Sequence, residues 1–151
     1  MLKFQIQKIF LLMILGLLSG CATGNLPDYI KAGHPYVRKI AGNYDRIIKV
    51  VKTVLSKEGW TVKTQLNPSV YERRSGGEDQ SNDVLFVTQS KRDSKILYST
   101  YAHLNVFVHA LADGAEIEIR YEILSPATTS LRNDKLANRI LDKIEQELEN
   151  K

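Results

Sequence analysis

Apolar residues recur along this chain with helical spacing in two stretches. Between Asn43 and Gly59 they share one side of a helix, at Tyr44, Ile47, Ile48, Val51, Val54 and Leu55. The stretch 131–149 repeats in the same way, at Ala137, Ile140, Leu141, Ile144 and Leu148. This spacing predicts two amphipathic helices with their apolar sides toward a core. We expect Asn43 to cap the first helix and Gly59 to end it, and Ser130 or Thr129 to cap the second.

Other stretches alternate apolar and polar residues, which is the pattern of half-buried strands. Residues 60–66 predict a strand with Trp60, Val62, Thr64 and Leu66 on one face. The runs 84–91, 95–111 and 115–124 predict a meander of three strands, and 36–40 predicts a short edge strand. Residues 67–83 are polar and include Gly76 and Gly77, so they predict a long solvated loop.

The dipeptide Asp113-Gly114 predicts a tight hairpin, because glycine accepts the positive φ of a type I′ turn. A tip at these residues gives three apolar cross-strand pairs: Val108–Ile119, Val106–Tyr121 and Leu104–Ile123. The opposite face then pairs His109–Glu118, Phe107–Arg120 and Asn105–Glu122. The preceding turn, near Asp93-Ser94, is expected to direct Leu85 and Val87 inward and Phe86 outward. The apolar face of the hairpin is expected to meet the helices.

These elements predict an α+β two-layer sandwich. Its sheet is mainly antiparallel with four to five strands, and the two helices pack on one face. A chain of 151 residues has the length of one domain, and we expect that domain to span 36–151. An antiparallel sheet can leave its second face in water.

That second face is the candidate partner surface. It is expected to carry aromatic and charged side chains: Phe86, Tyr101, His103, Phe107, His109 and Arg120. Aromatic residues and arginine are enriched at protein interfaces. The alternative is that Phe107 over Arg120, and His109 beside Glu118, stabilise the sheet without any partner.

The N-terminal residues have a different organisation. Residues 1–20 contain Lys3 and Lys8 and then an apolar run too short for an ordinary membrane span, which predicts a secretory signal peptide. Cys21, the one cysteine of the chain, follows the small residues Ser19 and Gly20. A solitary thiol in an exported protein has no disulfide partner within its chain.

The sequence Leu18-Ser19-Gly20-Cys21 resembles the lipobox of bacterial lipoproteins. The resemblance implies cleavage before Cys21 and diacylglycerol on its sulfur, which would anchor the protein in a membrane. Ala22 in place of aspartate implies the outer membrane, with the domain in the periplasm. Residues 22–35 contain two glycines and two prolines and predict a tether with a reach of roughly 50 Å.

Charge and residue spacing argue against several other functions. Without Lys3 and Lys8, 19 basic and 17 acidic side chains remain, too even a balance for a nucleic-acid partner. His103 and His109 lie about 20 Å apart along a strand, too far to share a metal ion. No nucleophile motif or spaced carboxylate pair indicates catalysis. We therefore expect neither an enzyme nor a cofactor.

The order of elements is similar to that of small outer-membrane assembly lipoproteins. These are the accessory lipoproteins of the β-barrel assembly machinery and the lipoprotein of the lipopolysaccharide translocon. The likeness lies in GWTVKT at 59–64 and DGAEIEIRYEIL at 113–124. It implies a non-catalytic binding or envelope-assembly module with an envelope protein as partner. The alternatives are a structural envelope lipoprotein, or a carrier of a lipid or small apolar ligand between sheet and helices.

Overall fold

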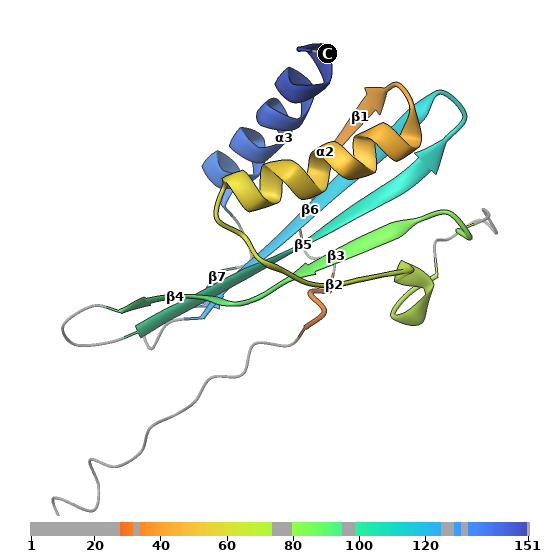
Figure 1. The fold of residues 1–151 in the computed structure, drawn as a ribbon. Helices are drawn as coiled ribbons and strands as arrows, with labels where there is room; N and C mark the ends of the chain where they lie inside the picture. The colour runs from red at the N-terminus through yellow and green to blue at the C-terminus, as the bar shows by residue number, and fades with distance from the viewer. Residues whose placement is uncertain are drawn as a thin grey trace, which may run out of the picture.

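The computed structural model describes residues 28–31, 34–73, 80–94, 99–124, 129–130 and 133–150. The predicted signal peptide and Cys21 lie outside the described residues. The chain forms an antiparallel sheet with two helices on one side of it (Figure 1). The predicted α+β two-layer sandwich is confirmed.

The elements follow one another as the apolar pattern predicts, with two short strands added. In chain order they are β1 (Tyr36–Ala41), α2 (Tyr44–Lys57), β2 (Val62–Leu66), a 3₁₀ turn (Pro68–Val70), β3 (Val84–Thr88), β4 (Lys91–Ser94), β5 (Ser99–Leu111), β6 (Gly114–Leu124), β7 (Thr129–Ser130) and α3 (Asp134–Glu149). The sheet has the order β1-β6-β5-β3-β2, and β4 pairs with β5 while β7 pairs with β6.

Both helices begin at an asparagine whose side chain accepts a backbone hydrogen bond. Asn43 Oδ1 accepts from the Arg46 amide at 3.0 Å, and Gly59 follows α2 with a φ of 70°. For α3 the predicted cap at Ser130 or Thr129 is wrong. Those two residues pair with β6, and Asn133 caps the helix by accepting from the Leu136 amide at 3.1 Å.

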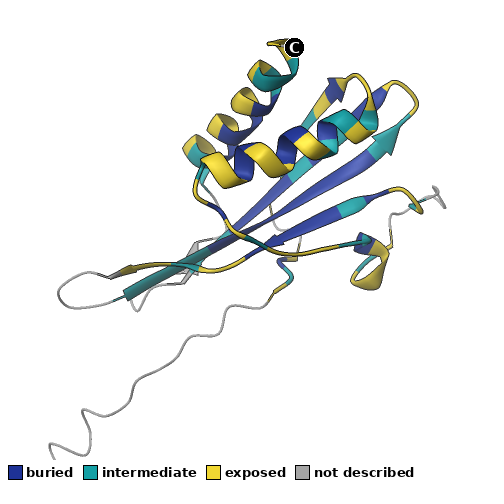
Figure 2. Cartoon of the chain, viewed as in Figure 1, coloured by how far each residue is buried: buried dark blue, intermediate teal, exposed yellow. Residues whose placement is uncertain are grey.

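The main core lies between the sheet and the two helices. Its members are apolar and almost fully buried, among them Ile47, Val51, Leu104, Val106, Ile117, Ile140 and Ile144. Figure 2 shows the buried side of each helix turned to the sheet. Full burial of one such side chain contributes about 1.5–3 kcal/mol, so this layer supplies most of the hydrophobic stabilisation.

The β5–β6 hairpin keeps its predicted faces but not its predicted register. Leu111 pairs with Gly114, Val108 with Ile117 and Val106 with Ile119, two residues away from the predicted pairs. A shift of two residues leaves every side chain on its predicted face. Gly114 lacks positive φ, and a Cβ there would lie 2.0 Å from the Ile40 carbonyl oxygen. The glycine is therefore needed for the close approach of β1 and not for a type I′ turn.

Two strands present faces that the alternation did not predict. Phe86 pairs with Val106 and belongs to the main core, while Leu85 and Val87 face the other way. The pairing with β5 shifts by one residue between β4 and β3, which exchanges the faces. At the shift, the Thr88 hydroxyl both accepts from the Leu104 amide and donates to the Leu104 carbonyl, each at 3.0 Å, so it replaces a backbone pair.

In β2 the prediction of one shared face is also wrong. A bulge between Val62 and Thr64 separates Val62, which packs on the main core, from Leu66, which packs on the opposite side. One extra residue in a strand reverses the faces beyond it.

Candidate functional site

The side of the sheet away from α2 and α3, here called the second face, carries a small apolar cluster set among charged groups. Leu85, Val87 and Phe107 form the cluster, and all three are fully buried. Asn105, His109 and Arg120 stand beside it, with 0%, 3% and 5% of their surfaces exposed. Adjacent strands place these side chains together, because Leu85 pairs with Phe107 and Asn105 pairs with Arg120.

Residues 28–31 lie on this second face, away from the helices (Figure 1). Ile30 is 4% exposed, and Tyr29 packs against the apolar cluster. Asn105 binds the backbone of the segment at two points: Oδ1 accepts from the Ile30 amide at 2.7 Å, and Nδ2 donates to the Asp28 carbonyl at 3.0 Å. The prediction that all of 22–35 is a tether is therefore wrong for these residues.

Arg120 connects the segment to the sheet and to the loop after the 3₁₀ turn. One guanidinium nitrogen donates to the Tyr29 hydroxyl and the Ile30 carbonyl, each at 3.0 Å. The other terminal nitrogen donates to Glu72 at 2.6 Å, and Nε donates to Glu118 at 2.5 Å. The guanidinium carbon also lies 4.0 Å from the centre of the Phe107 ring. One arginine thus joins three separate parts of the chain.

The contacts of this network favour the ionised forms of Arg120, Glu118 and Glu72. Burial disfavours the charge of Arg120, but its hydrogen bonds to Glu72 and Glu118 outweigh burial and raise its pKa. For Glu118, burial acts to raise the pKa, while hydrogen bonds from His109 and Arg120 lower it below its ordinary value. The pKa of Glu72 is lowered in the same way, against burial, by hydrogen bonds from Arg120 and Tyr29.

Aromatic rings hold Tyr29 from two sides. Its ring stacks on Tyr71, with centroids 4.6 Å apart, and meets Phe107 edge-on at 6.5 Å. The Tyr29 hydroxyl donates to Glu72 while accepting from Arg120. Burial and the bond to Glu72 raise the pKa of Tyr29, so the phenol stays protonated. The side chain is therefore fixed by stacking and by hydrogen bonds together.

His109 lies between two carboxylates at the far end of the network. Its Nδ1 is 2.7 Å from Asp83 Oδ2, and its Nε2 is 3.6 Å from Glu118 Oε2. The other oxygen of Asp83 accepts from the Ala110 amide at 2.9 Å. Carboxylates on opposite ring nitrogens fix the imidazole but do not converge on one point. Across the described part of the chain, no three His, Cys, Asp or Glu side chains are grouped to hold a metal ion.

The predicted partner face is not an open surface. Phe107, His103, His109 and Arg120 lie on the second face as predicted, but each is at most 5% exposed. Phe86 is in the main core, and Tyr101 is half-buried near Arg92, 5.8 Å from ring centre to guanidinium carbon. The exposed-face prediction is wrong because the chain covers this face itself. The predicted contacts of Phe107 with Arg120 and of His109 with Glu118 are present.

Sequence reasoning missed the residues that cover the face. Tyr29, Ile30, Glu72 and Asp83 lie in segments without periodicity. Tyr29-Ile30 is a pair of large side chains in a stretch otherwise rich in small and polar residues, and this was the available signal. The alternating pattern alone gives no reason to fold that pair back onto a strand more than seventy residues later.

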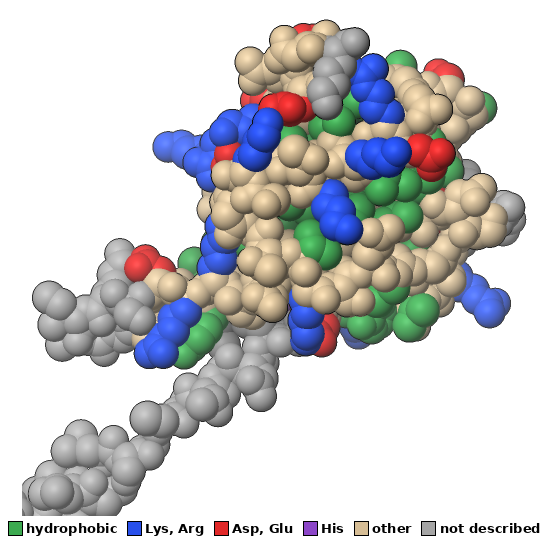
Figure 3. Space-filling model, viewed as in Figure 1, with side chains coloured by type: hydrophobic (Ala, Val, Ile, Leu, Met, Phe, Trp, Pro, Cys, Tyr) green, Lys and Arg blue, Asp and Glu red, His purple; other side chains and the backbone are tan. Residues whose placement is uncertain are grey.

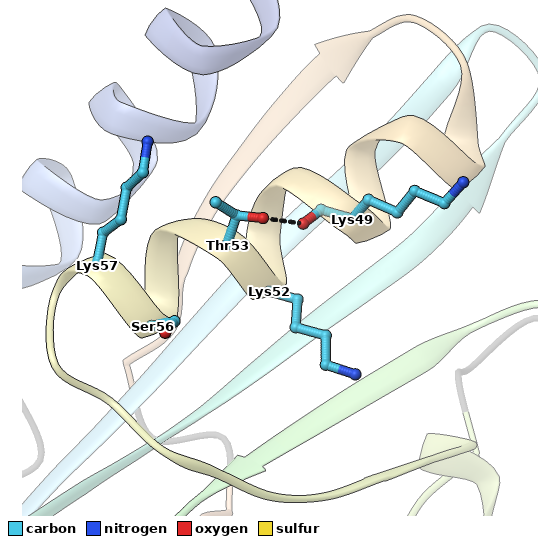
Figure 4. Close-up of a pocket in the computed structure, with 5 residues that line it drawn as sticks. All are labelled: Lys49, Lys52, Thr53, Ser56 and Lys57. Atoms are coloured by element: carbon cyan, nitrogen blue, oxygen red, sulfur yellow. Dashed lines mark hydrogen bonds between the residues drawn. The ribbon is translucent and has the colours of Figure 1, made fainter.

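A second candidate, a shallow hollow on α2, lacks the geometry of a binding site. It is lined by Lys49, Lys52, Thr53, Ser56 and Lys57. Figure 4 shows the three lysine side chains pointing in different directions, so they do not converge on a common anion. Lys57 pairs with Glu147 on α3. In the view of Figure 3, basic side chains are spread over the helix side with acidic ones among them.

No protein-family model matches this chain, and a search of the curated proteins found no match. Among the described residues, no helix combines the length and the apolar character needed to cross a membrane.

Proposed function

We propose that this protein is a membrane-anchored, non-catalytic module of the bacterial envelope that binds short polypeptide segments, acting in assembly or in holding a partner. The observation that carries the proposal is the way the second face holds residues 28–31. Asn105 and Arg120 bind backbone atoms of Asp28 and Ile30, and the neighbouring rings and apolar side chains hold Tyr29. Polypeptide-binding sites combine main-chain hydrogen bonds with side-chain pockets in this way.

The anchor is Cys21, acylated as the lipobox resemblance implies. Asp28 lies seven positions after Cys21, so the docked segment keeps the domain within about 25 Å of the lipid, half of the predicted reach. A partner would therefore be an envelope protein close to the same membrane. Ala22 favours the outer membrane, with the domain in the periplasm.

The packing of the molecule supports a binding module over a carrier of apolar ligands. Between the sheet and the helices, Ile47, Leu104 and Ile140 are at most 1% exposed. All three belong to one continuous apolar core. A carried acyl chain would need that space. Similarly, the charged groups of the second face bind one another and the chain, which supports recognition over catalysis.

Two experiments in cells test the proposal. Labelled palmitate should enter the protein, and Cys21→Ser should abolish both the labelling and sedimentation with membranes. Cross-linking of intact cells should then capture a partner protein with the wild-type chain, and less of it with Asn105→Ala. Absence of label would contradict the anchor, whereas equal capture by both chains would contradict binding through the second face.

A further inference from the structure

The second face is occupied by four residues of its own chain, and those residues are held as a bound peptide is held. We infer that it is an acceptor site for short segments in which an aromatic residue precedes an aliphatic one, and that residues 28–31 occupy it until a partner's segment replaces them. The inference rests on the proposed binding function and names the class of partner.

Recognition of the backbone requires no particular sequence. The Asp28 carbonyl, the Ile30 amide and the Ile30 carbonyl are bound by Asn105 Nδ2, Asn105 Oδ1 and Arg120 respectively, at 2.7–3.0 Å. These three groups exist in every peptide segment, proline excepted at the amide. The site therefore binds the backbone of a short segment through side chains, whatever the sequence of that segment.

Selectivity comes from the two side chains between those backbone bonds. The Tyr29 ring stacks on Tyr71 at 4.6 Å, and its hydroxyl reaches Glu72 and Arg120. Ile30 is 4% exposed, so its position takes a side chain that is apolar. A tyrosine followed by a branched aliphatic residue fits both positions, and a charged residue in the second position would be buried without a partner.

The acceptor groups keep their geometry through contacts within the sheet. Glu118 holds Arg120 Nε at 2.5 Å, and Phe107 lies under the guanidinium at 4.0 Å. Neither contact involves residues 28–31. A preformed acceptor loses little conformational entropy when one segment replaces another. The ion pair of the segment, Asp28 with Lys63, is half-exposed on both sides, so it adds little to the hold on residues 28–31.

Because the chain itself occupies the site, a competing peptide must be present at high concentration to bind there. Lys31 is joined to β1 through only four residues, and such short connections give effective concentrations in the millimolar range. A free peptide must exceed that concentration to displace the segment. Displacement would also free the chain from Cys21 up to Tyr36, which extends its reach from about 25 Å to about 50 Å. Partner binding would thus let the domain move away from its anchor.

The test uses the purified mature chain in detergent and a fluorescent peptide of residues 26–33, LPDYIKAG. The variant Tyr29→Ala/Ile30→Ala vacates the site. We expect it to bind the peptide saturably, at least tenfold more tightly than the wild type does. The same two alanines placed in the peptide should abolish binding, and Asn105→Ala added to the vacated chain should weaken it at least tenfold. A folded vacated variant without saturable binding would overturn the inference.

A measurement on the unaltered chain covers the case in which that variant does not fold. With the ¹⁵N-labelled wild type, several millimolar unlabelled peptide should move the Ile30 amide resonance toward its position in a free segment and leave that of Val106 in place. An unmoved Ile30 resonance means that the segment is a permanent part of the fold, and the inference is then wrong. Neither assay depends on acylation, so failure of the anchor at Cys21 is seen separately by palmitate labelling.

Discussion

Ile117 and Phe107 lie on opposite faces of one sheet, both fully buried, yet they are covered by different means. Over Ile117 lie two helices, α2 of 14 residues and α3 of 16, with continuous apolar packing. Over Phe107 lie Tyr29 from a four-residue segment and the guanidinium of Arg120. Equal burial on the two faces therefore hides unequal amounts of covering structure.

The difference determines what each face can do. Apolar packing is non-directional and depends little on pH, so the helix side stabilises the fold under all conditions in which the chain is folded. The second face depends on a few directional hydrogen bonds and on one buried cation with its two carboxylates. Such a surface is specific, sensitive to single substitutions and open to competition. The following predictions, from the largest expected effect to the smallest, test this contrast.

Arg120→Ala is expected to be among the most destabilising single changes. It leaves Glu118, whose side chain is 13% exposed, as a buried carboxylate without its main partner. Breaking a buried pair in this way costs about 3–5 kcal/mol. Urea unfolding followed by circular dichroism measures the loss. If the loss were below about 1 kcal/mol, the network would not be holding the second face.

Ile117→Ala tests the helix side. The side chain is fully buried in the main core, and its truncation is expected to lower the free energy of unfolding by about 2–5 kcal/mol. Unlike Arg120→Ala, this change should leave the contacts of residues 28–31 intact in the folded chain. The Ile30 amide resonance checks this. A large shift of that resonance would contradict the view that the two faces of the sheet are covered independently of each other.

Acid should loosen the second face before the helix side. The pKa values of Glu72 and Glu118 are lower in the folded chain than the ordinary 4.5, so their contribution to stability is complete above pH 4.5 and is lost as pH falls below it. The effect should be smaller than that of Arg120→Ala, because a protonated carboxyl still accepts hydrogen bonds. Exchange at the Ile30 amide, corrected for its intrinsic pH dependence, should lose protection below pH 4.5 while core amides of α2 keep theirs.

Arg38→Ala is the matched control for Arg120→Ala. Arg38 also binds two carboxylates, Asp142 at 2.7 Å and Glu145 at 2.8 Å, but these partners are 67% and 41% exposed. Water replaces such contacts readily, and the expected loss is about 0.2–1 kcal/mol. A loss as large as that of Arg120→Ala would show that burial is not what distinguishes the two sites.

The sequence was sufficient to predict the helix side of the fold. The stripes of α2 and α3, the cap at Asn43 and the alternation in β5 and β6 are local signals, and each corresponds to an element in the structure. The errors there are the cap of α3, which is Asn133, and shifts of strand register. At Thr88 a hydroxyl replaces a backbone pair, and in β2 a bulge reverses a face. Neither device leaves a mark in the apolar pattern.

The closure of the second face depends on contacts between distant parts of the chain. Tyr29 meets Arg120 across 91 positions, and Glu72 meets Arg120 across 48. No periodicity connects such residues. The alternation also directs Leu85 and Val87 to the helix side, whereas the structure places them with Phe107 on the second face. The apolar cluster, and with it the need for a cover, therefore did not follow from the sequence.

Hydrogen exchange at the Ile30 amide of the wild-type chain tests the central claim most directly. That amide donates to Asn105 Oδ1 at 2.7 Å, and Ile30 itself is only 4% exposed. The account predicts exchange at neutral pH at least about a hundredfold slower than in an unstructured peptide, with protection reduced by Asn105→Ala. Exchange at the unstructured rate would mean that residues 28–31 do not close the second face.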